Sequence, residues 1–137
     1  MPATKTAKSD SLDSIYDALH DIFSRYVPPL KIGGRKVLGK RDFHLTIPKA
    51  VVVPGAYGGK PVEIDVASLI RQKDYVGFYF MPVNMQPALK KKLAPALVAT
   101  LKGKTCFHIK KLTPDLFENV EAALNAGVQL YKDRGWL

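Results

Sequence analysis

Apolar and polar residues repeat with two different periods along this chain, and the change of period separates helices from strands. From Ser11 onward, apolar residues recur at the spacing of one helix face. Asp10 or Ser11 can cap this helix, and the pair Pro28 and Pro29 ends it, because the residue before a proline avoids the helical region. The pattern predicts an amphipathic N-terminal helix that follows a loose tail over residues 1–9.

Alternation of apolar and polar residues predicts strands in the middle of the chain. The clearest cases are residues 43–47 and 62–66, and a short apolar segment at 51–53 can pair as an edge. Residues 75–81 are apolar on both faces, which predicts a central strand covered on both sides. A further strand is expected at 105–109. The strands are few and short, so we expect one small sheet.

The segments between these strands carry turn and helix signals. Residues 31–41 form a basic connector whose glycines predict turns rather than a regular element. Leucines at helical spacing over 89–101 predict a helix that Pro95 interrupts. Thr113 and Pro114 are typical of a helix start, and Gly135 can close that last helix.

The order of these elements predicts one α+β domain over residues 10–137. Its single, mainly antiparallel sheet has about four to five strands, because the pattern predicts strands at 43–47, 62–66, 75–81 and 105–109 and a possible edge at 51–53. Helices at the N-terminal and C-terminal ends flank the sheet, and a further helix is inserted before the last strand.

The excess of basic residues adds a prediction, because it favours anionic partners. The chain has 21 basic and 12 acidic residues, a net charge of +9, and residues 31–60 contain seven basic residues and one acidic residue. Such a block attracts phosphates, nucleic acid or an acidic protein surface, although it also serves as a solubilising surface. The candidate anion-binding residues of this block are Arg35, Lys36, Lys40 and Arg41. Further candidates are Lys90, Lys91, Lys92, Lys102 and Lys104, with Tyr75, Phe78 and Tyr79 available to stack on bases.

Other features exclude several classes of protein. Cys106 is the only cysteine, so the chain has no internal disulfide. The N-terminus lacks the apolar region of a secretory signal, and the longest uncharged run is too short to span a bilayer. The glycine-rich segment 55–61 lacks the spacing and the hydroxyl residue of a phosphate loop. We therefore expect a cytoplasmic protein without a membrane partner.

Three blocks of sequence resemble one bacterial family. They are Phe78-Tyr79-Phe80-Met81-Pro82-Val83, the stretch from Leu101 to Lys110, and the C-terminal segment from Tyr131 to Leu137. Together they resemble the YdhG/YdeI-like domains of unknown function over a region from about Tyr16 to the C-terminus. One branch of that family is described as a frataxin-like intracellular iron chaperone. The resemblance implies iron as a ligand and iron-dependent assembly proteins as partners.

An acidic ridge on the first helix is the metal-binding candidate that this resemblance implies. Its members are Asp10, Asp13, Asp17 and Asp21, which recur three or four residues apart on the polar helix face, with His20 beside them. Carboxylates suit hard cations, so this face could hold iron weakly. The alternative is the solvated face of an amphipathic helix.

A second candidate lies on one face of the predicted sheet. Its members are His44, Glu63, Asp65, Tyr79, Cys106 and His108, which could point to one side because alternate strand residues share a face. Such a set could ligate zinc or iron, and a Cys–His pair could act as a nucleophile and its base. The alternative for Cys106 is a small apolar filler. The sequence contains no enzyme motif, so we favour a non-enzymatic binding protein.

Overall fold

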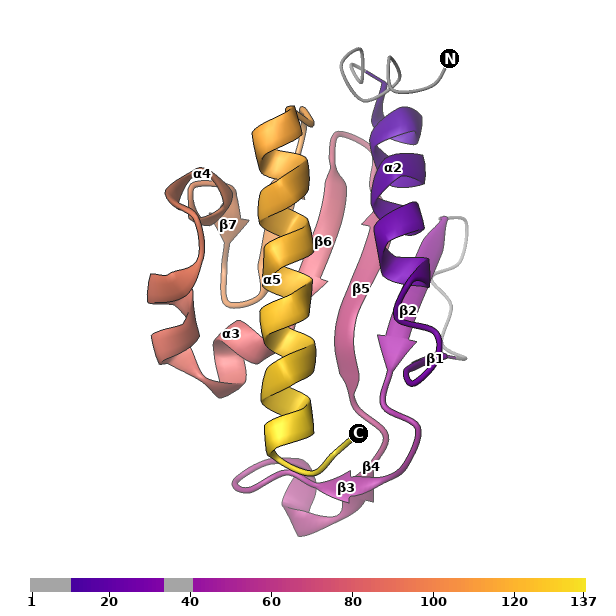
Figure 1. The fold of residues 1–137 in the computed structure, drawn as a ribbon, viewed down its shortest axis with the longest axis vertical. Helices are drawn as coiled ribbons and strands as arrows, with labels where there is room; N and C mark the ends of the chain where they lie inside the picture. Colours follow the sequence, from indigo (N-terminus) through magenta and orange to yellow (C-terminus); the bar gives the residue numbers. More distant parts are fainter. Residues whose placement is uncertain (1–10, 34–40) are drawn as a thin grey trace.

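Two long helices pack on one face of a six-stranded sheet (Figure 1). The computed structural model of the protein describes residues 11–33 and 41–137. Helix α2 (Leu12–Ser24) and helix α5 (Pro114–Asp133) lie side by side in front of the strands. Among the described residues, no helix combines the length and the apolar composition that a membrane span requires.

The sheet is antiparallel at every neighbouring pair of strands. Its strands follow the order β1-β2-β5-β6-β8-β7. Their bounds are Lys31–Ile32 (β1), Asp42–Thr46 (β2), Asp65–Arg71 (β5), Val76–Phe80 (β6), Leu101–Lys102 (β7) and Cys106–Ile109 (β8). A separate pair is formed by β3 (Val51–Val52) and β4 (Pro61–Val62), with a 3₁₀ turn η1 (Tyr57–Gly59) between them. The predicted α+β class and mainly antiparallel sheet are confirmed, and β6 is central as expected, but the strands form two sheets instead of one, and the main sheet is larger than predicted.

Two additional strands account for the larger sheet. Strand β1 lies in the segment that the glycines predicted to be irregular, and Lys31 and Ile32 pair there with Thr46 and Leu45 of β2. Strand β7 pairs with β8. Each has only two residues, so neither is long enough to show alternation in the sequence.

The predicted helix over 89–101 is wrong in its extent. The region contains two short helical segments instead, the 3₁₀ helix η2 (Pro87–Lys92) and α4 (Pro95–Val98), and then strand β7; a further short helix, α3 (Pro82–Met85), precedes them. The break at Pro95 is confirmed, and this proline begins α4, because its missing N–H costs nothing at the first helical position.

The predicted strand over 62–66 divides between two sheets. Strand β4 ends at Val62, and β5 begins at Asp65 and continues to Arg71. Alternation correctly placed Ile64 and Val66 inside, and both are buried. The remainder of β5 was missed because four consecutive buried residues follow Val66, and these carry no alternating signal.

The core lies between the helices and a phenylalanine-rich sheet surface. Phe78 is fully buried at the centre of this core. Its ring centroid lies 5.8 Å from the ring centroid of Phe23, 5.4 Å from that of Phe80 and 5.5 Å from that of Phe107. On the helix side, the predicted apolar stripe of α2 is buried as expected. Edge-to-face and offset ring contacts of this kind add to the stabilisation from burial.

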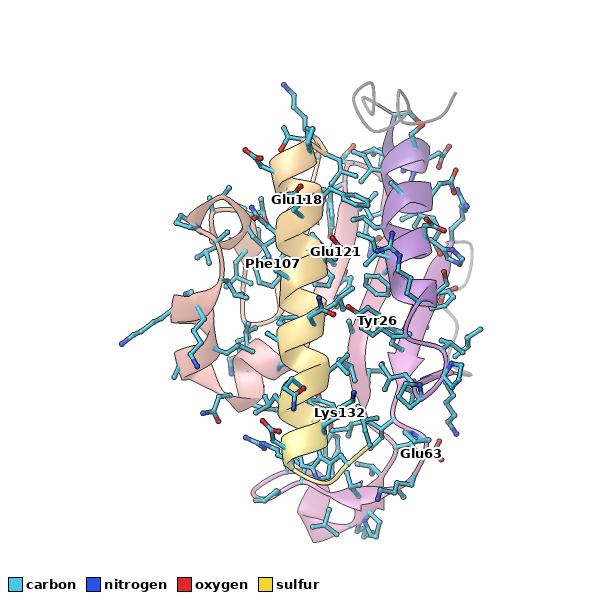
Figure 2. All side chains as sticks on the ribbon, in the orientation of Figure 1. Tyr26, Glu63, Phe107, Glu118, Glu121 and Lys132 are labelled. Atoms are coloured by element: carbon cyan, nitrogen blue, oxygen red, sulfur yellow. The ribbon has the colours of Figure 1, made fainter. Side chains whose placement is uncertain are left out.

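The ends of α5 follow the sequence signals closely. The Thr113 hydroxyl accepts a hydrogen bond from the Leu116 N–H at 3.1 Å. Gly135 has a φ of +79°, which a side chain would disfavour, and lets the chain reverse after the helix. Trp136 then packs on Tyr131 with ring centroids 5.1 Å apart. Figure 2 also shows Glu121 on α5 facing α2, where it pairs with Arg25.

Gly127 lies where α5 packs tightly against Phe80 and Pro82, and it gives a first testable prediction. A Cβ at this position would lie 2.7 Å from the Phe80 ring and 2.9 Å from Pro82. We expect Gly127→Ala to lower the free energy of unfolding by about 1–3 kcal/mol, because overpacking outweighs the gain in helix propensity. Urea denaturation followed by circular dichroism measures this. Gln129→Ala, at an exposed position of the same helix, is the control, and a Gly127→Ala protein as stable as that control would contradict the close packing.

Candidate functional site

The sheet face that points away from α2 and α5, here called the far face, carries a row of polar side chains. The register aligns His44 with Ser68, Ser68 with Tyr79, and Tyr79 with Cys106. Because cross-strand partners lie on the same side of a sheet, the row runs across four neighbouring strands. Its two ends differ in burial and chemistry.

At the β2–β5 end, the row is part of a buried hydrogen-bond network. His44 Nε2 lies 2.8 Å from an Asp42 carboxylate oxygen, and His44 Nδ1 lies 2.7 Å from the Ser68 hydroxyl. The network continues to Asp65, which accepts hydrogen bonds from the hydroxyls of Thr46 at 2.7 Å and Ser68 at 3.4 Å. The side chains of His44 and Asp42 are 2% and 4% exposed. The imidazole is therefore fixed in orientation from both sides.

The network lies against a pocket of about 470 Å³. Pockets of this size hold small molecules, and a few convergent polar groups usually orient the ligand. The lining residues come from β1, β2, η1, β4 and the start of β5: Lys31, Ile32, Gly33, His44, Thr46, Tyr57, Val62, Glu63, Ile64 and Asp65. The pocket thus combines an apolar wall with the polar floor that the network provides.

The pocket rim has two features that are unusual for a solvated surface. Ile32 is 57% exposed and Tyr57 is 49% exposed, and both are large apolar side chains. Tyr57 also has a φ of +54°, and it is the only non-glycine residue with positive φ in the described part of the chain. Such strained backbone is concentrated at functional sites. An ion pair at 2.6 Å joins Lys31 and Glu63 beside them.

The order carboxylate, imidazole, hydroxyl in this network is also that of a catalytic triad. Ser68, however, is 4% exposed and is not among the residues that line the pocket. Its hydroxyl is directed to His44 and Asp65 instead. The arrangement therefore presents no accessible nucleophile, and it orients the pocket floor instead.

The structure divides the predicted sheet-face residues into two groups. His44, Glu63 and Asp65 all line the pocket. The remaining three, Tyr79, Cys106 and His108, lie on β6 and β8 at the other end of the far face. Sequence reasoning missed the role of Ser68 and Thr46, for which the only available signal was a polar residue within an apolar strand.

The surroundings of Cys106 and His108 differ from those that a catalytic Cys–His pair requires. Burial raises the pKa of the Cys106 thiol, although its hydrogen bond with Tyr79 acts in the opposite direction. A reactive cysteine requires a lowered pKa. His108 stacks on the Tyr75 ring, with centroids 3.7 Å apart. Catalysis by this pair stays a hypothesis without support from the geometry.

The acidic ridge of α2 is largely engaged with arginines. Asp17 pairs with Arg41 at 2.6 Å, and Asp13 pairs with Arg71 at 2.9 Å. Asp21 is exposed, His20 packs edge-on to Phe43, and Asp10 lies outside the described residues. In the described part of the chain, no group of three or more His, Cys, Asp or Glu side chains could hold a metal ion. Iron binding at the ridge stays a prediction, and it would compete with two guanidinium groups.

The basic segment after β1 is described only at its end. Arg35, Lys36 and Lys40 lie outside the described residues. Arg41 contacts α2, where its guanidinium carbon lies 4.3 Å from the centre of the Tyr16 ring. Its hydrogen bond with Asp17 raises the Arg41 pKa further. Arg41 is thus held to the first helix, and anion binding by this segment remains a hypothesis.

Comparison of the chain with family models, curated proteins and solved structures finds no match. The YdhG/YdeI-like resemblance, with the iron chemistry that it implies, therefore stays a prediction.

Proposed function

We propose that this protein is a small cytoplasmic binding protein whose pocket holds a small organic molecule with a cationic or hydrogen-bond-donating group. The observation that carries this proposal is the pocket of about 470 Å³ whose floor is the buried network of His44, Thr46 and Asp65. A polar network of this kind orients ligand-binding groups at fixed positions, which reduces the entropic cost of binding.

The charges of the pocket favour a ligand that donates hydrogen bonds over one that accepts them. Two carboxylates, those of Glu63 and Asp65, line it against one ammonium group, that of Lys31. Lys31 is already paired with Glu63. Both His44 ring nitrogens have partners within the protein. The lining therefore has an excess of carboxylate over ammonium charge, and because a carboxylate oxygen can accept more than one hydrogen bond, it favours amines and other donors.

A matched set of small probes tests the proposal. Benzylamine, benzyl alcohol and benzoate share one apolar body and differ in charge, so a ¹H–¹⁵N NMR titration with each isolates the polar group. We expect benzylamine at millimolar concentration to shift the amide signals of Ile32, Thr46 and Val62, with weaker effects from the alcohol and none from benzoate. Asp65→Asn should weaken the benzylamine shifts while the spectrum remains that of a folded protein.

A second variant tests whether the ligand occupies the pocket itself, and it leaves the residues of the pocket floor unchanged. Ile32→Trp places a larger side chain at the pocket rim, and Val52→Trp makes the same kind of change on β3, where the side chain is also exposed and does not line the pocket. We expect only Ile32→Trp to prevent the benzylamine shifts. Equal responses to benzoate and benzylamine, or equal effects of the two tryptophans, would refute the proposal.

A further inference from the structure

The β6–β8 end of the far face carries three aromatic rings, and we call Tyr75, Tyr79 and His108 the aromatic platform. Tyr75 and His108 stack with their rings 8° from parallel. Gly77, which pairs with His108 in the register, lies under the Tyr79 ring, since a Cβ there would be 2.5 Å from that ring. Because Gly77 has no side chain, the ring can lie down on the sheet. All three platform residues are partly exposed.

The Tyr79 ring of the platform is held in place by a polar contact at its edge, and the Tyr75 and His108 rings by their mutual stacking. The Tyr79 hydroxyl accepts a hydrogen bond from the Gln72 amide at 3.2 Å. Burial raises the Tyr79 pKa to about 12, so the phenol stays neutral. The His108 pKa is lowered, mainly by burial and then by Lys102 and Lys110, so the imidazole tends toward its neutral form. Neutral, fixed rings are suited to stacking with flat ligands.

Lysines surround this platform. Lys102 is the cross-strand partner of Cys106, Lys104 lies in the β7–β8 turn, and Lys110 directly follows β8. All three are exposed, and no salt bridge to them is found in the part of the chain that the structure describes. Lys102 pairs with Cys106, two residues before His108, and Lys110 lies two residues after His108, so both charges lie near the rings. The surface therefore combines flat aromatic groups with unneutralised positive charge.

We infer that this surface binds single-stranded nucleic acid, with bases on the aromatic platform and phosphates on Lys102, Lys104 and Lys110. Stacking rings beside lysines that can contact phosphates are the combination that single strands use. A duplex hides its base faces and cannot reach the platform. The inference is independent of the proposed pocket ligand, because no platform residue lines the pocket.

Fluorescence anisotropy with a labelled single-stranded oligonucleotide of about 12 nucleotides tests this inference. Competitors are the matching duplex and inorganic polyphosphate, which has the charge but no bases. We expect the single strand to bind more tightly than either, with an affinity that falls as salt rises. Tyr75→Ala should weaken it about fivefold to a hundredfold, as loss of one stacked base does, and Tyr75→Phe should retain most of the affinity.

The lysines are tested by a charge-matched pair of variants. Lys102→Gln/Lys110→Gln should lower the slope of log affinity against log salt by about 1.4, since each phosphate contact to a single strand contributes about 0.7. Lys49→Gln/Lys132→Gln removes the same charge at exposed positions outside the platform, and Figure 2 shows Lys132 on α5, on the other side of the sheet. This control should leave the slope nearly unchanged.

Three outcomes would overturn the inference. One is that polyphosphate competes as well as the single strand and Tyr75→Ala has no effect, which would mean binding by charge alone. Another is that both lysine pairs lower the slope equally. The third is the absence of binding at low salt in a protein whose spectrum is folded. Ile32→Trp should not change the oligonucleotide affinity, so failure here is distinguishable from failure of the pocket proposal.

Discussion

Replacement of Phe78 by alanine is expected to lower the free energy of unfolding by about 3–5 kcal/mol. Phe78 lies on the central strand β6, is fully buried, and packs against Phe23, Phe80 and Phe107, which come from α2, β6 and β8. Truncation removes the ring that joins a helix to two strands, and it leaves a cavity that the surrounding rings cannot fill.

Phe117→Ala is the matched control for this prediction. Phe117 is the same residue type at the start of α5, but it is only partly buried and packs at the margin of the core. Urea denaturation should therefore show a much smaller loss for Phe117→Ala. If both variants lost the same stability, the central position of the Phe78 ring would be in doubt.

The second large effect is expected at the buried network. His44→Ala should lower the free energy of unfolding by at least about 2 kcal/mol, because it removes a hydrogen bond to the Asp42 carboxylate, a kind worth about 1.5–3 kcal/mol, together with the hydrogen bond to Ser68. Two groups are affected, the Asp42 carboxylate and the Ser68 hydroxyl, both of which contact the imidazole directly. Ser68→Ala removes the hydroxyl contacts with His44 and Asp65 but leaves the pair of His44 with Asp42 intact, so it should cost less.

A comparison with His108→Ala makes this prediction specific. His108 lies on the same sheet face, but it is partly exposed and its described ring contact is with Tyr75. We expect this variant to lose under about 1 kcal/mol, as for most surface substitutions. Thermal and urea denaturation measure both. A His44→Ala protein no less stable than His108→Ala would mean that the network does not contribute to stability.

The long helices could be predicted from the sequence because their signals are local. Helix α5 has an N-cap at Thr113 and a C-terminal glycine at Gly135, and α2 has an apolar stripe. Each helix is therefore specified by residues that are neighbours in sequence. Strands β1 and β7 could not be predicted in this way. Their two residues become strands only because β2 and β8 lie beside them, and a pairing of two residues produces no periodic pattern in the sequence.

The candidate site was predictable in its residue types but not in its grouping. Alternation placed His44 and Asp65 on the face away from the core, which agrees with their position in the pocket. The pocket itself needs Lys31 and Tyr57, which come from β1 and from the turn between β3 and β4. A residue set assembled from four separate segments depends on the register of the sheet, and the register was not specified by any local pattern.

The shortness of β1 and β7 has a consequence for the behaviour of the protein at high concentration. These two strands form the outer edges of the sheet, and each offers only two residues of unpaired backbone to an incoming strand. Lysine occurs on both, at Lys31 and Lys102. Short, charged edges are poor templates for adding a further strand. The fold therefore resists edge-to-edge aggregation, even though its interior strands are strongly apolar.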